Sequence, residues 1–167
     1  MIILGIDPGT LKAGYGVIRL EDSRPRFIDC GTIVLKKSQP ISDRLISLYD
    51  QIESLIRLHD PAAVAVETQY ILENPKSALQ LSMARGVVLV VARKFGLSIF
   101  EYSPSKIKQA LTGSGSATKA LVQKTVQTIA KMDSLPQPDA ADALGIAICH
   151  SAHLKLQGQR ELWPNQI

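Results

Sequence analysis

The segment that most constrains the fold is residues 1–7, in which six residues of apolar or small character run directly into a carboxylate, Asp7. An unbroken apolar run predicts a strand that is buried on both faces, at the centre of a sheet. Pro8 and Gly9 follow it and end the strand. A carboxylate buried there without a partner is costly, so two interpretations stay open. Either a cation satisfies Asp7, or Asp7 starts an Asp-Pro-Gly turn.

A second apolar segment repeats this pattern, because Ala-Ala-Val-Ala-Val at 62–66 leads into Glu67. Between the two segments, residues 14–20 and 26–35 predict strands that form an antiparallel meander with the first strand. Residues 40–59 have apolar side chains at helical spacing, with Ser42 as the candidate N-cap. If the strands ending at Asp7 and Glu67 are parallel neighbours, both carboxylates lie at the sheet edge where α/β proteins bind ligands.

Two more acidic residues open the last predicted helix, which follows the rigid linker 134–138. Asp139 and Asp142 are three residues apart and share one face, set among Ala, Leu and Ile. Acidic residues in a first turn also oppose the helix dipole favourably, which is the alternative reading. If this helix lies against the sheet edge, four carboxylates form one cluster, and such a cluster requires cations. Oxygen ligands without His or Cys favour Mg²⁺ or Mn²⁺, and His150 lies two turns too far along to be a direct ligand.

The remaining segments predict helices, one more strand and a loop. Residues 77–95 predict a helix that is apolar most of the way round, which indicates a core helix or one that covers a partner. Residues 97–102 predict a fifth strand, and Ser103-Pro104 then starts a short helix that carries Lys108. The loop 112–119 is rich in glycine and hydroxyl groups and ends at Lys119. It is either a phosphate-contact surface or an ordinary surface loop.

Composition narrows the class of protein. The chain has 167 residues, 46% of them hydrophobic, which fits one globular domain. Its net charge of +4 favours a polyanionic partner. Cys30 and Cys149 lack metal-ligand spacing, so we expect two free thiols in a reducing compartment. The apolar run 86–92 is too short to cross a membrane, and residues 1–6 lack the basic region of a signal peptide. These features predict a cytoplasmic protein.

The acidic strand ends and the closing Asp-x-x-Asp helix resemble the ribonuclease H-like fold, an α/β fold with a five-stranded mixed sheet flanked by helices. An ordered set of motifs is similar to the RuvC family of Holliday junction resolvases: 5–9 with 14–17, Glu67, 77–79, 84–86, 112–115 with Lys119, 138–144 and 147–150. The resemblance runs from Ile2 to about His153. We therefore expect a nuclease domain over 1–153 and a C-terminal tail over 154–167.

This resemblance implies a homodimeric, Mg²⁺-dependent endonuclease, with Mn²⁺ as a substitute metal. Such an enzyme resolves four-way DNA junctions by paired nicks in homologous recombination and DNA repair, with the branch-migration proteins RuvA and RuvB as partners. The family's catalytic and metal-binding acids match Asp7, Glu67, Asp139 and Asp142. Lys108 and Lys119 match its DNA-contacting lysines, and Tyr70 stands where the family usually carries a phenylalanine that stacks on bases. The turn 10–13 departs from the family's commoner basic pattern.

Two other functions fit parts of the sequence. An actin-like ATPase also has a nucleotide turn after its first strand, but it needs a duplicated fold, and 167 residues contain no second copy. A junction-binding module without cleavage would not need all four acids. A nicking assay on a four-way junction, with and without Mg²⁺, distinguishes the three functions.

Overall fold

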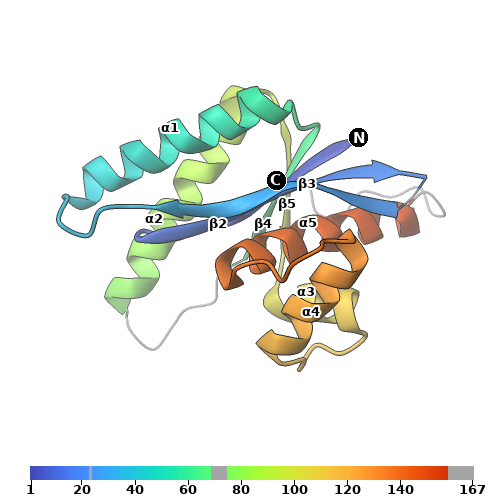
Figure 1. Cartoon of the computed structure of the whole chain (residues 1–167). Coiled ribbons are helices and arrows are strands. Elements are labelled where there is room, and N and C mark those ends of the chain that lie inside the picture. The colour runs from blue at the N-terminus through green and yellow to red at the C-terminus, as the bar shows by residue number, and fades with distance from the viewer. Residues whose placement is uncertain (23, 69–74, 158–167) are drawn as a thin grey trace.

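A five-stranded sheet of order β3-β2-β1-β4-β5 lies between two layers of helices (Figure 1). The computed structural model describes residues 1–22, 24–68 and 75–157. The strands are β1 (Ile2–Asp7), β2 (Lys12–Glu21), β3 (Arg24–Val34), β4 (Ala63–Glu67) and β5 (Ser98–Tyr102). The helices are α1 (Ile41–His59), α2 (Pro75–Lys94), α3 (Pro104–Thr112), α4 (Lys119–Ala130) and α5 (Pro138–Gln157).

The pairing of the strands confirms the expected mixed sheet. β1, β2 and β3 form an antiparallel meander, and β4 pairs in parallel with both β1 and β5. Strand ends differ from those expected by at most two residues. A five-stranded mixed sheet flanked by helices is the architecture expected of the ribonuclease H-like fold.

The helix ends confirm one predicted N-cap and contradict another. Ser103 is the N-cap of α3 and accepts a hydrogen bond from the Lys106 backbone N–H, with Pro104 in the first turn, as expected. Ser42 is not the N-cap of α1. Pro40 takes an extended conformation, so the helix begins directly after it and Ser42 falls inside the first turn. The Ser42 hydroxyl donates instead to the Asp43 carboxylate.

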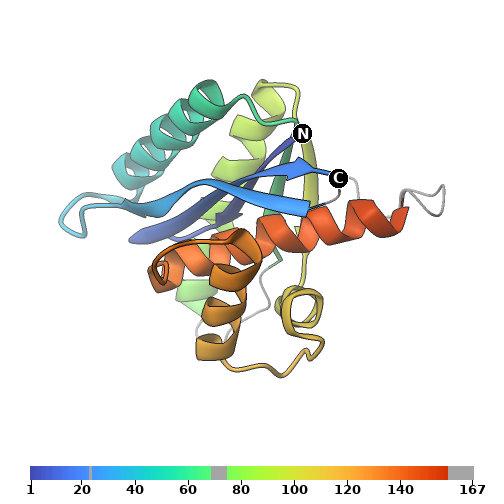
Figure 2. The ribbon, with the colours of Figure 1, turned by 45° about the vertical axis from the view of Figure 1, so that its right-hand side comes forward.

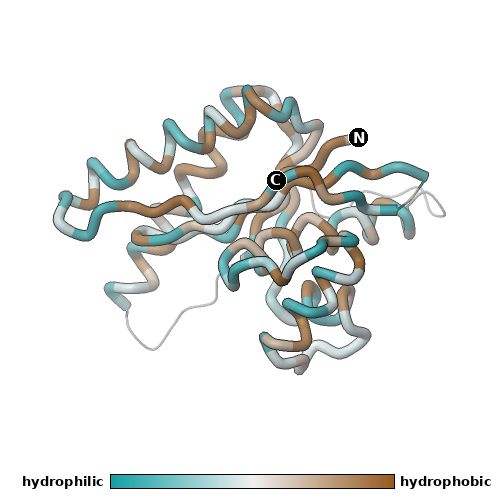
Figure 3. Tube along the Cα trace, in the orientation of Figure 1, coloured by the Kyte–Doolittle hydropathy of each residue, from teal (hydrophilic) through white to brown (hydrophobic). Residues whose placement is uncertain are grey.

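Two hydrophobic cores fill the spaces on either side of the sheet. Alternate side chains of a strand point to opposite faces, so Leu4 and Ile6 pack under α1 and α2, while Ile3 packs under α5. Figure 2 shows α5 crossing this second face, with α3 and α4 packed beyond it. Apolar residues accordingly follow the strands and the inward sides of the helices (Figure 3).

Glycines let α5 lie directly on β1 and β2. A β-carbon at Gly5 would overlap the Ala143 carbonyl oxygen, and one at Gly14 would overlap the Asp139 carbonyl oxygen. This close backbone approach extends to Gly16, where a β-carbon would overlap the Leu144 backbone. Only a residue without a side chain allows it.

α5 continues past the expected domain boundary at residue 153 and ends at Gln157. The remaining tail lies outside the described residues, so the division into domain and tail stays a prediction. Within the described ranges, every helix is too short or too polar to span a membrane. Cys30 and Cys149 are both free thiols.

Candidate active site

The sheet places two carboxylates side by side. The parallel register of β1 with β4 runs to Ile6 and Val66, and the next residues are Asp7 and Glu67, where the two strands end. Because alternate residues share a face, Asp7 lies on the same side of β1 as Ile3 and Gly5, over which α5 passes. Glu67 likewise follows Ala63 and Ala65 of the α5-side core. The parallel pairing that the sequence left conditional is therefore present.

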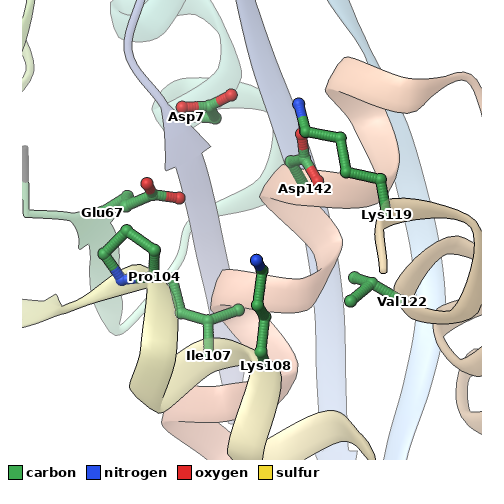
Figure 4. A pocket seen from close by; sticks show the side chains of 8 residues that line it. All are labelled: Asp7, Glu67, Pro104, Ile107, Lys108, Lys119, Val122 and Asp142. Atoms are coloured by element: carbon green, nitrogen blue, oxygen red, sulfur yellow. The ribbon is translucent and has the colours of Figure 1, made fainter. Parts of the chain in front are cut away.

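α5 brings the third and fourth carboxylates to this edge, and α3 and α4 bring two lysines. A cavity of about 230 Å³ is lined by residues from β1, β4, α3, α4 and α5: Asp7, Glu67, Pro104, Ile107, Lys108, Lys119, Val122 and Asp142. In Figure 4, Asp7 and Glu67 lie on one side, Asp142 and Lys119 on the other, and the Lys108 amine points between them. Lys119 Nζ lies 4.0 Å from Asp142 Oδ2, and its side chain is 87% exposed.

Asp139 lies beside the cavity and is not among the residues that line it. Its charge nevertheless reaches the other acids, because it contributes to raising the pKa of both Asp7 and Asp142. The structure thus brings Asp7, Glu67, Asp142, Lys108 and Lys119 together, with Asp139 as a close neighbour. Tyr70 lies outside the described residues.

Burial and mutual repulsion make these carboxylates hard to ionise. Burial, and then the charges of Glu67, Asp142 and Asp139, raise the pKa of Asp7 from 3.8 to about 7, although Lys119 acts in the opposite direction. Burial also raises the pKa of Glu67 and of Asp142, and both lysines oppose these increases. Near neutral pH the edge therefore carries a proton that a cation could replace.

The chemistry of the donors fits a hard divalent cation. Asp7, Glu67, Asp139 and Asp142 offer only carboxylate oxygens, the ligands that Mg²⁺ and Mn²⁺ prefer. These four carboxylates are neighbours, but they do not surround a single point at which an ion would be enclosed. In the part of the chain that the structure describes, no three His, Cys, Asp or Glu side chains converge closely enough to hold an ion.

The sequence did not predict the apolar walls of the cavity or the contacts behind it. Ile107 and Val122 carry α3 and α4 against α5, and both belong to the core on that side of the sheet. Helical spacing marks them as apolar but does not say which helices meet. Behind Glu67, the buried residues Tyr102 and His150 form a hydrogen bond. The available signal for this contact was Tyr102 itself, a tyrosine at the end of β5, the strand that follows β4 in the chain.

Comparison with known proteins identifies the family of the chain. The family model "Crossover junction endodeoxyribonuclease RuvC" matches residues 3–150. The protein of that name from Protochlamydia amoebophila is 47% identical over 152 residues, which cover 90% of each chain. The protein of that name from Chromohalobacter salexigens is 46% identical over 150 residues, covering 90% of this chain and 80% of that one.

A solved structure is similar over the same extent. The structure of Thermus thermophilus RuvC in complex with a Holliday junction substrate superposes with a TM-score of 0.88 at 31% identity, covering 93% of this chain and 96% of that one. The family match and these relatives each span most of the chain. The chain therefore belongs to the RuvC family of crossover junction endodeoxyribonucleases.

Proposed function

We propose that the acidic edge formed by Asp7, Glu67, Asp139 and Asp142 is the active site of a junction-resolving endonuclease. The family is that of crossover junction endodeoxyribonucleases, and a relative has been seen bound to a Holliday junction substrate. One observation carries the assignment: carboxylates from β1, β4 and α5 meet two lysines at one cavity. An acidic site rimmed by lysines suits a phosphodiester substrate. Resolution of four-way junctions in homologous recombination and DNA repair is the corresponding role.

We assign Mg²⁺ as the cofactor, with Mn²⁺ as a substitute, held by these four carboxylates. When bound, such ions would provide Lewis-acid stabilisation of the phosphate and a water of lowered pKa. The protein groups have separate tasks. Burial and the neighbouring acids raise the pKa of Asp7 to about 7, and a bound cation would favour its ionised form. Lys108 and Lys119, at the rim, bind the phosphates that flank the scissile bond.

The first experiment measures nicking of a synthetic four-way junction in Mg²⁺, in Mn²⁺ and in excess chelator. We expect paired nicks in either metal and none in chelator. Asp142→Asn should bind the junction and fail to nick it. Asp50→Asn is the matched control, because Asp50 is exposed on α1 and away from the cavity. Nicking by Asp142→Asn at the wild-type rate would contradict the assignment of the acidic edge as the active site.

We further propose that the chain acts as a homodimer joined through α2. One face of α2 packs in the core through Ala84, Val88, Val91 and Ala92. On the other face Leu79, Met83 and Val90 are 62%, 43% and 63% exposed. Together with Gly86 they repeat at intervals of four, three and four residues, the spacing of a helix–helix seam. A β-carbon at Gly86 would meet nothing within 4 Å, so a partner helix can approach closely there.

A two-fold dimer also suits the substrate, because a four-way junction requires two equivalent cuts. Val90→Glu should shift the protein from dimer to monomer in analytical ultracentrifugation. Ile46→Glu is the control, since Ile46 is a 61% exposed apolar residue on α1. A Val90→Glu protein that sediments as a dimer would exclude this face of α2 as the interface.

Three further points of the proposal follow from family membership. The branch-migration proteins RuvA and RuvB are the expected partners at the junction. The cytoplasm is the expected location, which suits the two free thiols. Tyr70 is assigned to stacking on junction bases.

A further inference from the structure

A buried polar contact lies directly behind the acidic edge. The Tyr102 hydroxyl and His150 Nδ1 are 2.7 Å apart and form a hydrogen bond, in which the ring tautomer decides the donor. Tyr102 is 2% exposed and His150 is fully buried. The imidazole also stacks on Phe100, with the ring centroids 4.2 Å apart. This contact therefore joins the end of β5 to the middle of α5.

Tyr102 contacts the part of the backbone that carries Glu67. It is the register partner of Glu67 in the parallel pairing of β4 with β5. Its carbonyl oxygen accepts a hydrogen bond of 2.9 Å from the backbone N–H of Thr68, the residue after Glu67. A movement of Tyr102 would therefore move the end of β4 and the carboxylate that it presents.

His150 is fixed to the other half of the site through one rigid element. It lies on α5 eight residues beyond Asp142, which is about 12 Å along the helix axis. The glycine contacts of α5 are with β1 and β2, and the position of α5 there follows from Gly5, Gly14 and Gly16. Those contacts do not involve β4 or β5. The hydrogen bond from His150 to Tyr102 supplies a directional tie to that side of the sheet.

Packing alone does not explain a buried tyrosine–histidine pair at this position. Among the described residues, the buried His150 Nε2 has no hydrogen-bond partner. Burial, with a smaller contribution from His153, lowers the pKa of His150 to about 4, so the ring is neutral at physiological pH. An apolar side chain of similar volume would avoid the desolvation of this ring. The polar contact is therefore a directional constraint that a leucine could not provide.

We propose that Tyr102 and His150 are positioning residues, which hold the Glu67 end of β4 at a fixed distance from Asp142 on α5 and so set the affinity of the acidic edge for its divalent cation. The inference rests on the proposed metal role of Glu67 and Asp142. Neither Tyr102 nor His150 touches the substrate or the cation. Their effect is transmitted by one backbone hydrogen bond and one helix.

The test measures Mn²⁺ binding to the full-length protein by isothermal titration calorimetry without DNA. Tyr102→Phe keeps the ring and removes the hydroxyl, and it should weaken Mn²⁺ binding about tenfold, as the loss of supporting hydrogen bonds around metal ligands does. The Mn²⁺ concentration for half-maximal nicking should rise by the same factor, while the rate at saturating Mn²⁺ is retained. Melting temperatures of the metal-free proteins report folding separately.

The control is Tyr49→Phe, which also removes a hydroxyl from a hydrogen bond. The Tyr49 hydroxyl accepts from Lys94 Nζ at 2.6 Å between α1 and α2, on the opposite face of the sheet. Its Mn²⁺ affinity should equal that of the wild type. At the other partner, His150→Asn keeps a polar group near the Nδ1 position and should retain more Mn²⁺ affinity than His150→Leu.

Three results separate the possible failures. If Asp142→Asn binds Mn²⁺ as tightly as the wild type, the metal role of the acids is wrong, and the positioning proposal is lost with it. If Asp142→Asn weakens binding but Tyr102→Phe does not, the acids hold the cation and the positioning role alone is refuted. A lower metal-free melting temperature for Tyr102→Phe with unchanged Mn²⁺ affinity at a temperature where it is folded also refutes it, because the pair is then purely structural.

Discussion

Replacing Asp7 with Asn should make the metal-free protein more stable and inactive. In the folded chain, burial and the neighbouring acids raise the pKa of Asp7 to about 7 from an ordinary value of 3.8. The unfolded chain therefore releases this proton at a lower pH than the folded chain does. Stability consequently falls as the pH rises from about 4 to about 7, and it stays reduced above that range.

The size of the effect follows from the two pKa values. Each unit of pKa difference corresponds to about 1.4 kcal/mol, so the ionised Asp7 lowers the free energy of unfolding by at most about 4 kcal/mol. The amide of Asn at the same site is also desolvated, which leaves an expected gain of about 2 kcal/mol. For a chain of this length that gain raises the melting temperature by about 4 to 8 °C.

The assay is thermal unfolding of wild type and Asp7→Asn in chelator, from pH 4 to pH 8. The difference in melting temperature should be small at pH 4 and largest at pH 8. Adding Mg²⁺ should stabilise the wild type, by about 2.7 kcal/mol at one hundred times its dissociation constant, and should stabilise Asp7→Asn much less. Asp50→Asn, an exposed substitution on α1, controls for a general change of net charge.

Two results would refute this reasoning. An Asp7→Asn protein that is less stable than the wild type at pH 8 without metal would mean that ionised Asp7 does not destabilise the folded chain. A gain in stability that does not vary with pH would assign the effect to packing. Nicking at a near wild-type rate in Mg²⁺ would separately contradict the role of Asp7 in the active site.

Three other sets of substitutions test separate parts of the molecule. Lys119→Ala or Lys108→Ala should weaken junction binding equally for all sequences and reduce the slope of log affinity against log salt by about one, so a changed sequence preference with an unchanged slope would contradict a phosphate contact. Tyr70→Ala should reduce nicking by about ten- to a hundredfold, whereas Tyr70→Phe should change little, because stacking needs only the ring; normal cutting by a folded Tyr70→Ala would exclude stacking. Gly14→Ala places a β-carbon on the Asp139 carbonyl oxygen and should lower stability by about 1–3 kcal/mol in urea titrations, while Gly115→Ala, which meets only ordinary contacts, should not.

Much of the fold could be predicted because the decisive signals are local. The apolar runs before Asp7 and Glu67 define two buried strands, and their period of two decides which face each carboxylate joins. What the pattern could not supply is the pairing of elements that are distant in the chain. The cavity walls Ile107 and Val122 became visible only when α3 and α4 were seen against α5.

The candidate site also has a part that the sequence predicted and a part that it could not. Types of residue at strand ends and in a first helical turn identified the acids, and the structure brings Asp7, Glu67 and Asp142 to one cavity. Asp139 shares a helix face with Asp142 yet is not among the residues that line the cavity. The hydrogen bond between Tyr102 and His150 joins residues forty-eight positions apart, so no spacing in the sequence marks it.

The seating of α5 on β1 and β2 has a consequence for the order in which activity appears during synthesis. β1 and β2 leave the ribosome first, and the helix that covers them, with Asp139 and Asp142, leaves last. Such contacts between the two ends of a chain form slowly, since a long loop must close before they contribute. A nascent chain that stops before Pro138 carries only half of the acids, and its glycine-lined groove is uncovered. On the proposed assignment of the four acids, cleavage would begin only once α5 has been made and has packed on β1 and β2.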